Sequence, residues 1–244
     1  MKGFADDRIY NAAKAQNMSG TLPRERDLPN VALFKMNLRA TRIHRAITRG
    51  RPGKDIPINV ISLVAGKNVA ASNPLYYLQA VRSGARDSGT GLFRCEAEYK
   101  QVEKHAAELL SCGLTADSFD SIVAAPTTRR QLQDPFLDAI RLRLPKAVDL
   151  SVNLSIVDNE IKSDSHHSME ERVTNLRWSE GTDWIPIRRI LIVDDVISRG
   201  RTAVPLIHSI RDQCSAARNY EITICAPLWI MRDDGDSWLV PASN

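Results

Sequence analysis

The sequence predicts an α/β fold built on a mostly parallel, twisted sheet with helices on both faces. One observation is the apolar run Ile190–Val193, which is too short for a buried helix and is typical of a central strand of a parallel sheet. A second is the apolar run at 122–125, which an amphipathic helix pattern follows over 136–144. A third is the helical spacing of apolar residues over 203–210. Strands that alternate with helices in this way favour a parallel sheet.

The remaining elements follow from the same patterns. Apolar β-branched residues predict a strand over 56–64, and Asn73–Pro74 is a plausible start of a helix. A second helix is expected over 99–110, and alternating apolar residues predict a partly exposed strand over 150–156. A last strand is expected over 222–228.

Composition sets the class of protein. A chain of 244 residues with 43% hydrophobic content can bury a full core. There is no apolar run of membrane-spanning length and no signal-peptide core, so we expect a cytoplasmic protein that does not enter a membrane. The 4 cysteines are widely spaced without a C-x-x-C pair, so the sequence indicates neither a disulfide framework nor a metal site.

The N-terminal part of the chain is expected to form a region distinct from the main α/β domain. We divide the chain into an arm with a basic amphipathic helix over 1–55 and a main α/β domain over 56–244. Residues 31–55 carry more positive charge than the net +4 of the whole chain. On a helix, the basic residues would lie beside an apolar face. This segment is either a docked helix with a solvated charged face or a surface for RNA, DNA or an acidic protein partner, formed by Lys35, Arg39, Arg42 and Arg49.

The strongest functional motif follows the strand at 190–193. Asp194 and Asp195 stand at its carboxyl end, where ligands bind in open α/β sheets. Small residues around a glycine come next and leave backbone amides open at the start of a helix, which is an arrangement that holds a phosphate group. This loop consists of Ser198, Arg199, Gly200, Arg201 and Thr202.

A second motif follows the strand at 122–125. It is a turn rich in hydroxyl and guanidinium groups, formed by Thr127, Thr128, Arg129 and Arg130. Two guanidinium groups can bind pyrophosphate with directional hydrogen bonds. The helix after this turn is expected to open at Asp134–Pro135.

The stretch from 159 to 183 has many charges and few apolar residues. Long loops inside compact domains are often lids, so we interpret this one as a lid that carries Lys162, Arg172 and Arg177. Within it, residues 169–175 read Met-Glu-Glu-Arg-Val-Thr-Asn.

The segment 189–202 resembles the phosphoribosyl pyrophosphate (PRPP) motif of type I phosphoribosyltransferases. Residues 169–175 look like the E-R-x-x-N segment of competence-associated (ComF-like) phosphoribosyltransferase-like proteins, although their N-terminal zinc-binding cysteines are missing here. The resemblance implies that Asp194 and Asp195 hold the ribose hydroxyls, that 198–202 wraps the 5-phosphate, and that 127–130 holds pyrophosphate beneath the lid. It also implies Mg²⁺, carried by PRPP or pyrophosphate. Arg199 departs from the Thr or Ser usual in the family, and it could strengthen or alter phosphate binding.

The implied activity is transfer of ribose 5-phosphate from PRPP to a nitrogen acceptor, with release of pyrophosphate. The C-terminal part often forms a hood over the acceptor base in this family, so Trp229 and Trp238 are candidates to stack on it. One alternative is a non-catalytic protein that senses PRPP or a nucleotide, or binds nucleic acid, for example as an accessory protein of a mobile element or phage-defence system. Another is a nucleotide or nucleoside hydrolase that uses the same pocket. The acceptor and the oligomeric state stay open.

Overall fold

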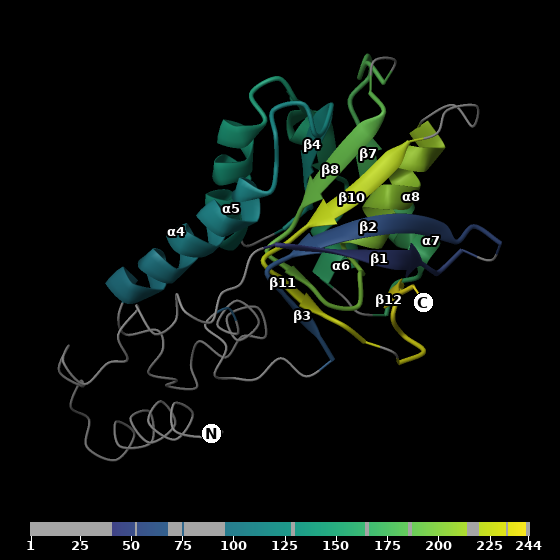
Figure 1. Ribbon diagram of the computed structural model, residues 1–244. Coiled ribbons are helices and arrows are strands. Elements are labelled where there is room, and N and C mark those ends of the chain that lie inside the picture. The colour runs from purple at the N-terminus through teal and green to yellow at the C-terminus, as the bar shows by residue number, and fades with distance from the viewer. Residues whose placement is uncertain are drawn as a thin grey trace.

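The computed structural model describes residues 41–51, 53–67, 75, 96–127, 130–163, 166–184, 187–213, 220–232 and 234–242, with the backbone alone at 96–99, 101, 162 and 163. Their main element is a mixed sheet of seven strands in the order β12-β1-β2-β10-β8-β4-β5 (Figure 1). Five neighbouring strands are parallel: β2 (Ile56–Ser62), β10 (Glu221–Cys225), β8 (Arg189–Val193), β4 (Ser121–Ala124) and β5 (Val148–Asp149). The mostly parallel α/β sheet expected from the sequence is therefore confirmed.

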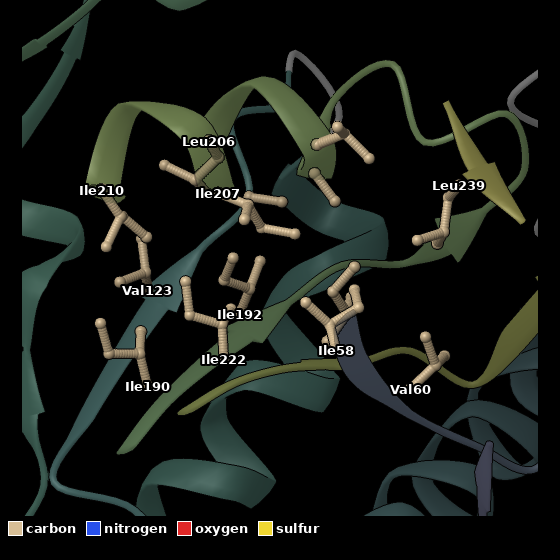
Figure 2. Packing of buried hydrophobic residues seen from close by; sticks show 14 of the residues in the cluster. Ile58, Val60, Val123, Ile190, Ile192, Leu206, Ile207, Ile210, Ile222 and Leu239 are labelled. Carbon is tan, nitrogen blue, oxygen red and sulfur yellow. The ribbon is translucent and has the colours of Figure 1, made fainter. Parts of the chain in front are cut away.

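The central strand β8 divides the core into two layers. Its side chains alternate between the two faces of the sheet, as the pleat of a strand requires. Leu191 and Val193 pack toward α4 (Glu96–Cys112) and α5 (Arg130–Arg143). Ile190 and Ile192 pack on the other face, beneath α8 (Ala203–Gln213), and Figure 2 shows them below the apolar side of that helix. Figure 1 shows these helices on opposite faces of the sheet.

The chain changes direction across the sheet between β4 and β8. From β4 the chain runs through α5 to β5, which lies on one side of β4. From β8 it runs through α8 to β10, which lies on the opposite side of β8. Because α5 and α8 also cover opposite faces, the carboxyl ends of β4 and β8 form a topological switch point, and a crevice opens there in α/β folds.

Three of the parallel strands continue past the main sheet. After a break of one or two residues, β2, β10 and β8 lead into β3 (Val64–Gly66), β11 (Leu228–Ile230) and β9 (Val196–Ile197). These pair in the order β3-β11-β9 and repeat the order of the strands before them. The break in β8 is formed by Asp194 and Asp195, so the acidic pair lies where one sheet passes into the other.

The stretch 159–183 is not the irregular loop expected from its composition. It contains α6 (Asn159–Ser163), α7 (Met169–Thr174) and β7 (Leu176–Trp178), and β7 pairs with β6 (Leu154–Ile156). Of its apolar residues, Met169, Val173 and Trp178 are buried in the core cluster that includes α8, and Ile161 and Leu176 are half-buried. The predicted strand at 150–156 is also shorter, because a 3-10 helix occupies Leu150–Asn153 before β6 begins.

The helix expected in the N-terminal region is wrong for residues 42–48. This segment is β1 (Arg42–Thr48), which is antiparallel to β2 and to β12 (Leu239–Pro241). Apolar residues four apart fit a helix, but Ile43 is 71% exposed and the strand instead buries Ala46 and Thr48. Because β1 pairs with β2, the sheet crosses the boundary expected at residue 55. Lys35 and Arg39 lie outside the described residues.

Arg51 fixes the β1–β2 hairpin to the helices behind it. Its guanidinium donates to both carboxylate oxygens of Glu170 on α7, at 2.7 Å each. It also donates to Asp212 on α8, at 3.0 and 2.8 Å. These ion pairs raise the pKa of Arg51, with the hydrogen bond to Glu170 as the largest cause. Arg51 therefore connects the hairpin to α7 and to the carboxyl-terminal end of α8.

Two further expectations concern helices. Helix α5 begins at Arg130 rather than at Asp134, so Pro135 lies inside it. The helix expected to start at Asn73–Pro74 falls outside the described residues apart from Leu75, which is buried. Within the described ranges, no helix combines the length and the apolar content needed to cross a bilayer.

Candidate functional site

Two cavities lie at the topological switch point. The small cavity has a volume of about 30 Å³ and the large cavity about 500 Å³. Both are lined by Pro126, which follows β4, and by Ile156 of β6, so the cavities are neighbours. One water needs about 10–15 Å³, so the small cavity has room for roughly two water-sized groups. The large cavity falls in the range of small-molecule sites, roughly 300–1,000 Å³.

The small cavity has positively charged walls. Its ionisable lining residues are Arg172 of α7 and Arg201, and no acid lines it. Thr202 and Pro205 bring the start of α8 to the same cavity, which adds the positive end of that helix. Arg172 is 8% exposed, so its charge acts where water screens it weakly. This electrostatic environment is suited to an anion.

The large cavity lies between α5 and the segment that leads into β6. Thr127 and Arg130 of the predicted pyrophosphate turn line it, and Arg130 is the first residue of α5. The other polar residues of the lining are Gln133, Asp134, Arg141, Ser151 and Ser155. Thr128 and Arg129 lie outside the described residues. Described residues of both predicted motifs thus line the adjoining cavities, with Pro126, Thr127 and Arg130 from one motif and Arg201 and Thr202 from the other.

Gln133 marks the point where β4 and β8 separate. Its buried side-chain amide donates to the carbonyl oxygens of Ala125, at 2.9 Å, and Val193, at 2.8 Å. Strand β8 continues into β9, whereas β4 ends at Ala124 and is followed by no strand of the second sheet among the described residues. The amide thus bridges two buried carbonyl groups at the root of the crevice, and the Val193 carbonyl also accepts from the Ala125 amide at 2.8 Å.

The loop 198–202 is held by the segment before β12. Arg199 donates to Asp234 from Nε at 3.2 Å and from Nη2 at 3.0 Å, and its carbonyl accepts a hydrogen bond from the Trp238 amide at 2.8 Å. Hydrogen bonds from Ser237 and then Arg199 lower the pKa of Asp234. Gly200 has a φ of +77°. Arg199 is thus engaged in an ion pair with Asp234, and Arg201 lies 3.9 Å from the Asp236 carboxylate and lines the small cavity.

The two acids are buried, with Asp194 at 2% and Asp195 at 0% exposure. The Asp194 amide donates to the Cys225 carbonyl at 3.0 Å, and the Asp195 amide donates to Asp194 Oδ1 at 2.9 Å. Neither acid lines the small or the large cavity. They are therefore at the expected edge of the sheet, but they are covered from solvent by the continuation of the strands.

The other predicted site residues are dispersed. Arg177 is an exposed residue of β7 and lines neither cavity, and the side chain of Lys162 lies outside the described part of the structure. Arg42 and Arg49 are exposed at opposite ends of β1, about 23 Å apart at the rise of a strand, so they do not share the expected helix face. Trp229 is fully buried in the core and cannot stack on a ligand in this arrangement.

Sequence reasoning missed Gln133 and gave Trp238 a different role. A glutamine within an amphipathic helix carries no local signal that it will meet the carbonyls of two strands. Trp238 instead contacts the arginines of the small cavity, and its ring centroid lies 5.8 Å from the guanidinium carbons of both Arg172 and Arg201. This distance is within the range of a cation–π interaction.

Comparisons with known proteins do not identify the chain: no protein-family model, no curated protein and no solved structure matches it. Among the described residues, no group of three or more His, Cys, Asp or Glu side chains is placed to hold a metal ion. The chemistry of the site therefore has to be argued from its own residues.

Proposed function

We propose that the switch-point crevice binds phosphoribosyl pyrophosphate and that the protein transfers its ribose 5-phosphate to a nitrogen acceptor. The observation that carries this proposal is the pair of adjoining cavities. One is small and lined by two arginines, and the other, at about 500 Å³, is large enough for a sugar phosphate. The resemblance of 189–202 to the PRPP motif adds support, because the loop of that motif supplies Arg201 and Thr202 to the small cavity.

The proposed reaction needs no nucleophilic side chain. The bond between the anomeric carbon and the pyrophosphate oxygen breaks, a bond to the acceptor nitrogen forms, and the acceptor proton passes to solvent. Arg130 and Thr127 would hold the leaving pyrophosphate in the large cavity. The cavity walls offer mainly guanidinium and hydroxyl groups, which do not favour Mg²⁺, so the ligand's own oxygens would hold that ion. Mg²⁺ would offset the charge of the leaving group.

A second candidate function is a sensor that binds the same ligand without turnover. The burial of Asp194 and Asp195 favours it, because buried acids do not contact a sugar in either cavity unless the strand ends part. Screening pyrophosphate release over bases and nucleic acids separates the two functions. Release that depends on an acceptor supports transfer, whereas PRPP binding without release supports sensing.

The first prediction is that PRPP with Mg²⁺ stabilises the protein. At a hundredfold excess over Kd, binding contributes about 2.7 kcal/mol. For a chain of this size that raises Tm by roughly 5–10 °C. The measurement is thermal unfolding with and without PRPP and Mg²⁺.

In the proposed transfer reaction the strand ends part so that Asp194 and Asp195 reach the sugar, and the double substitution Asp194→Asn and Asp195→Asn is then expected to abolish the shift. Ribose with Mg²⁺ is the control and is expected to leave Tm unchanged. An unchanged Tm of the parent protein with PRPP at millimolar concentration would overturn the proposed function.

A further inference from the structure

We propose that one face of the β1–β2 hairpin is a binding surface for single-stranded RNA. This hairpin face consists of the outward-facing residues along β1 and of the β2 residues opposite them: Ile43, Arg45, Ile47, Arg49, Pro57 and Asn59. None of these residues lines the small or the large cavity. The hairpin face is therefore a second site, and it does not depend on the proposed function.

The alternation of side chains along β1 places two arginines on the exposed side of the sheet. Ala46 and Thr48 are buried, at 1% and 0% exposure, whereas Ile43 is 71% exposed and Arg45 and Arg49 are exposed as well. Because alternate residues of a strand share a side, the exposed residues form one row, along which the two arginines lie about 13 Å apart. In Figure 1, no described helix is drawn in front of β1 and β2, and α8 lies behind them. The row is therefore accessible to a partner.

The two arginines of the hairpin face are held by their backbone and free at their side chains. The Arg45 carbonyl accepts from the Ala242 amide at 3.0 Å, and the Arg49 amide donates to the Trp238 carbonyl at 2.7 Å. Neither arginine side chain has a hydrogen bond or an ion pair within the described part of the chain. Arg51 differs, because acids of α7 and α8 already bind its guanidinium. Arg45 and Arg49 thus keep their charge for a partner outside the chain.

The chemistry of the hairpin face fits a single nucleic-acid strand. A guanidinium group matches the oxygens of a phosphate with paired hydrogen bonds, and its flat face can stack on an unpaired base. The isoleucines that alternate with the arginines offer apolar contact to bases, and Ile43 leaves most of its side chain in water until a partner covers it. The bases of a duplex are stacked inside the helix, so a flat sheet face does not reach them. An extended strand with exposed bases is therefore the better fit.

An acid at the border of the hairpin face favours RNA over DNA. Glu221 of β10 is exposed and accepts a hydrogen bond from Asn59 at 3.4 Å, and Asn59 is the residue paired with Arg45. The basic neighbour of Glu221 in the sheet, Arg189, is engaged with Asp120 at 2.7 Å. A carboxylate repels phosphate but accepts a hydrogen bond from a ribose 2′-hydroxyl, which DNA lacks. A strand bound along the arginines thus gains a contact at Glu221 when it is RNA.

The test is fluorescence anisotropy of the full chain with labelled oligouridylate at several salt concentrations. We expect the parent protein to bind this RNA and Arg45→Gln with Arg49→Gln to weaken binding about tenfold or more, as expected for the loss of charged hydrogen bonds. Each phosphate contact to a single strand contributes about 0.7 to the slope of log K against log salt, so the double variant should lower the slope by about 1.4.

Arg143→Gln with Arg177→Gln is the matched control, because it removes the same charge at exposed arginines of α5 and β7. Its affinity and its salt slope should equal those of the parent, and circular dichroism checks the fold of each variant. An equal loss of affinity in the two double variants would be a response to net charge alone and would overturn the assignment of the hairpin face. Absence of binding by the parent would overturn it as well.

Two further ligands test the kind of partner. Oligodeoxyuridylate differs from the RNA in its missing 2′-hydroxyl groups, so we expect it to bind more weakly and Glu221→Ala to narrow the difference. Equal affinity of the parent for both strands overturns the assignment to RNA. Oligoglutamate should not displace the RNA, and displacement at equal concentration of charge would identify a surface for an acidic protein instead. The thermal shift with PRPP should be the same in the Arg45 and Arg49 double variant as in the parent, so the two sites are tested separately.

Discussion

Gly200 connects the phosphate-binding loop of the proposed site to the last strand of the sheet. Its φ of +77° is open to glycine and strained for other residues. The space beside it is also filled, because an added Cβ would lie 2.7 Å from Leu239 Cβ and 2.9 Å from Val204 Cγ2. The position therefore excludes a side chain for two independent reasons, conformation and contact with β12 and α8.

Gly200→Ala is predicted to cost more stability than Gly181→Ala, which is the matched control. Gly181 has a φ of +84°, but an added Cβ would meet nothing within 4 Å. Both substitutions carry the left-handed backbone cost of about 1–2 kcal/mol. Gly200→Ala adds overpacking of about 1–3 kcal/mol. Urea unfolding measures the difference, and equal losses in the two variants would show that the contact with Leu239 relaxes freely.

Some residues of the candidate site could be predicted from the sequence, and others could not. In the sequence, two apolar strands are each followed by site residues: Thr127 and Arg130 after the first, and Arg201 and Thr202 after the second. The local sequence pattern therefore predicts that all four lie at one edge of the sheet. Arg172 is 29 residues before Arg201 in the chain, and only the packing of α7 on α8 brings them to one cavity. The burial of Asp194 and Asp195 depends on three strands that bend together, which no single stretch of sequence specifies.

At the scale of elements, the local sequence pattern predicted the wrong structure for both β1 and α7, for opposite reasons. In β1, apolar residues four apart suggested a helix, but the segment forms a strand because it pairs with β2 on one edge and with β12 on the other. Tertiary pairing often overrides propensity in this way. In the 159–183 stretch, low apolar content suggested a loop, although the Ser168 and Glu171 spacing of a capping box was present in the sequence. The strands β4 and β8 were predictable because they are short apolar runs, and β10 because its apolar residues Ile222 and Ile224 alternate with polar or small ones.

The capping box makes the stability of α7 sensitive to acid. Hydrogen bonds from Ser168 lower the pKa of Glu171 from 4.5 to about 2, with a smaller effect of His167. Because the pKa is lower in the folded state, the carboxylate stabilises the protein above about pH 4.5, and this contribution is lost as the pH falls toward about 2.

Glu171→Gln is therefore predicted to be less stable than the parent protein at pH 6, with a gap that narrows toward pH 3. Chemical unfolding at several pH values measures the gap. Ser168→Ala should lose about 1 kcal/mol as a missing N-cap and should show the same narrowing. A gap that stays constant from pH 6 to pH 3 would contradict this role of Glu171.

At the scale of the whole molecule, one sheet joins two separate cores. The core beneath α4 and α5 contains Leu191, Phe136 and Leu110. The opposite core contains or contacts all four tryptophans of the chain, Trp178, Trp184, Trp229 and Trp238. Tryptophan fluorescence thus reports on one face of the sheet, whereas circular dichroism reports on both.

Leu191→Ala tests whether the two cores unfold together. Leu191 is fully buried on the face without tryptophan, so the substitution should cost about 2–5 kcal/mol. Because both cores share β8, we expect the midpoints from fluorescence and from circular dichroism to fall by the same amount. Leu142→Ala, at a leucine that is 83% exposed on α5, should change neither midpoint by much. A fluorescence midpoint that does not move with Leu191→Ala would reveal two independently unfolding layers.

The position of the β1–β2 hairpin in the sheet has a consequence for synthesis on the ribosome. Its two neighbours, β10 and β12, are the last strands of the sheet to be made, and Asn59 of β2 and Glu221 of β10, whose side chains share a hydrogen bond, are 162 positions apart. At a synthesis rate of about 5–20 residues per second, both edges of the hairpin stay unpaired for roughly 8–32 s. Exposed edges of this kind invite pairing with other chains. The nascent protein therefore passes through an interval of aggregation risk that ends only when its final strands close the sheet.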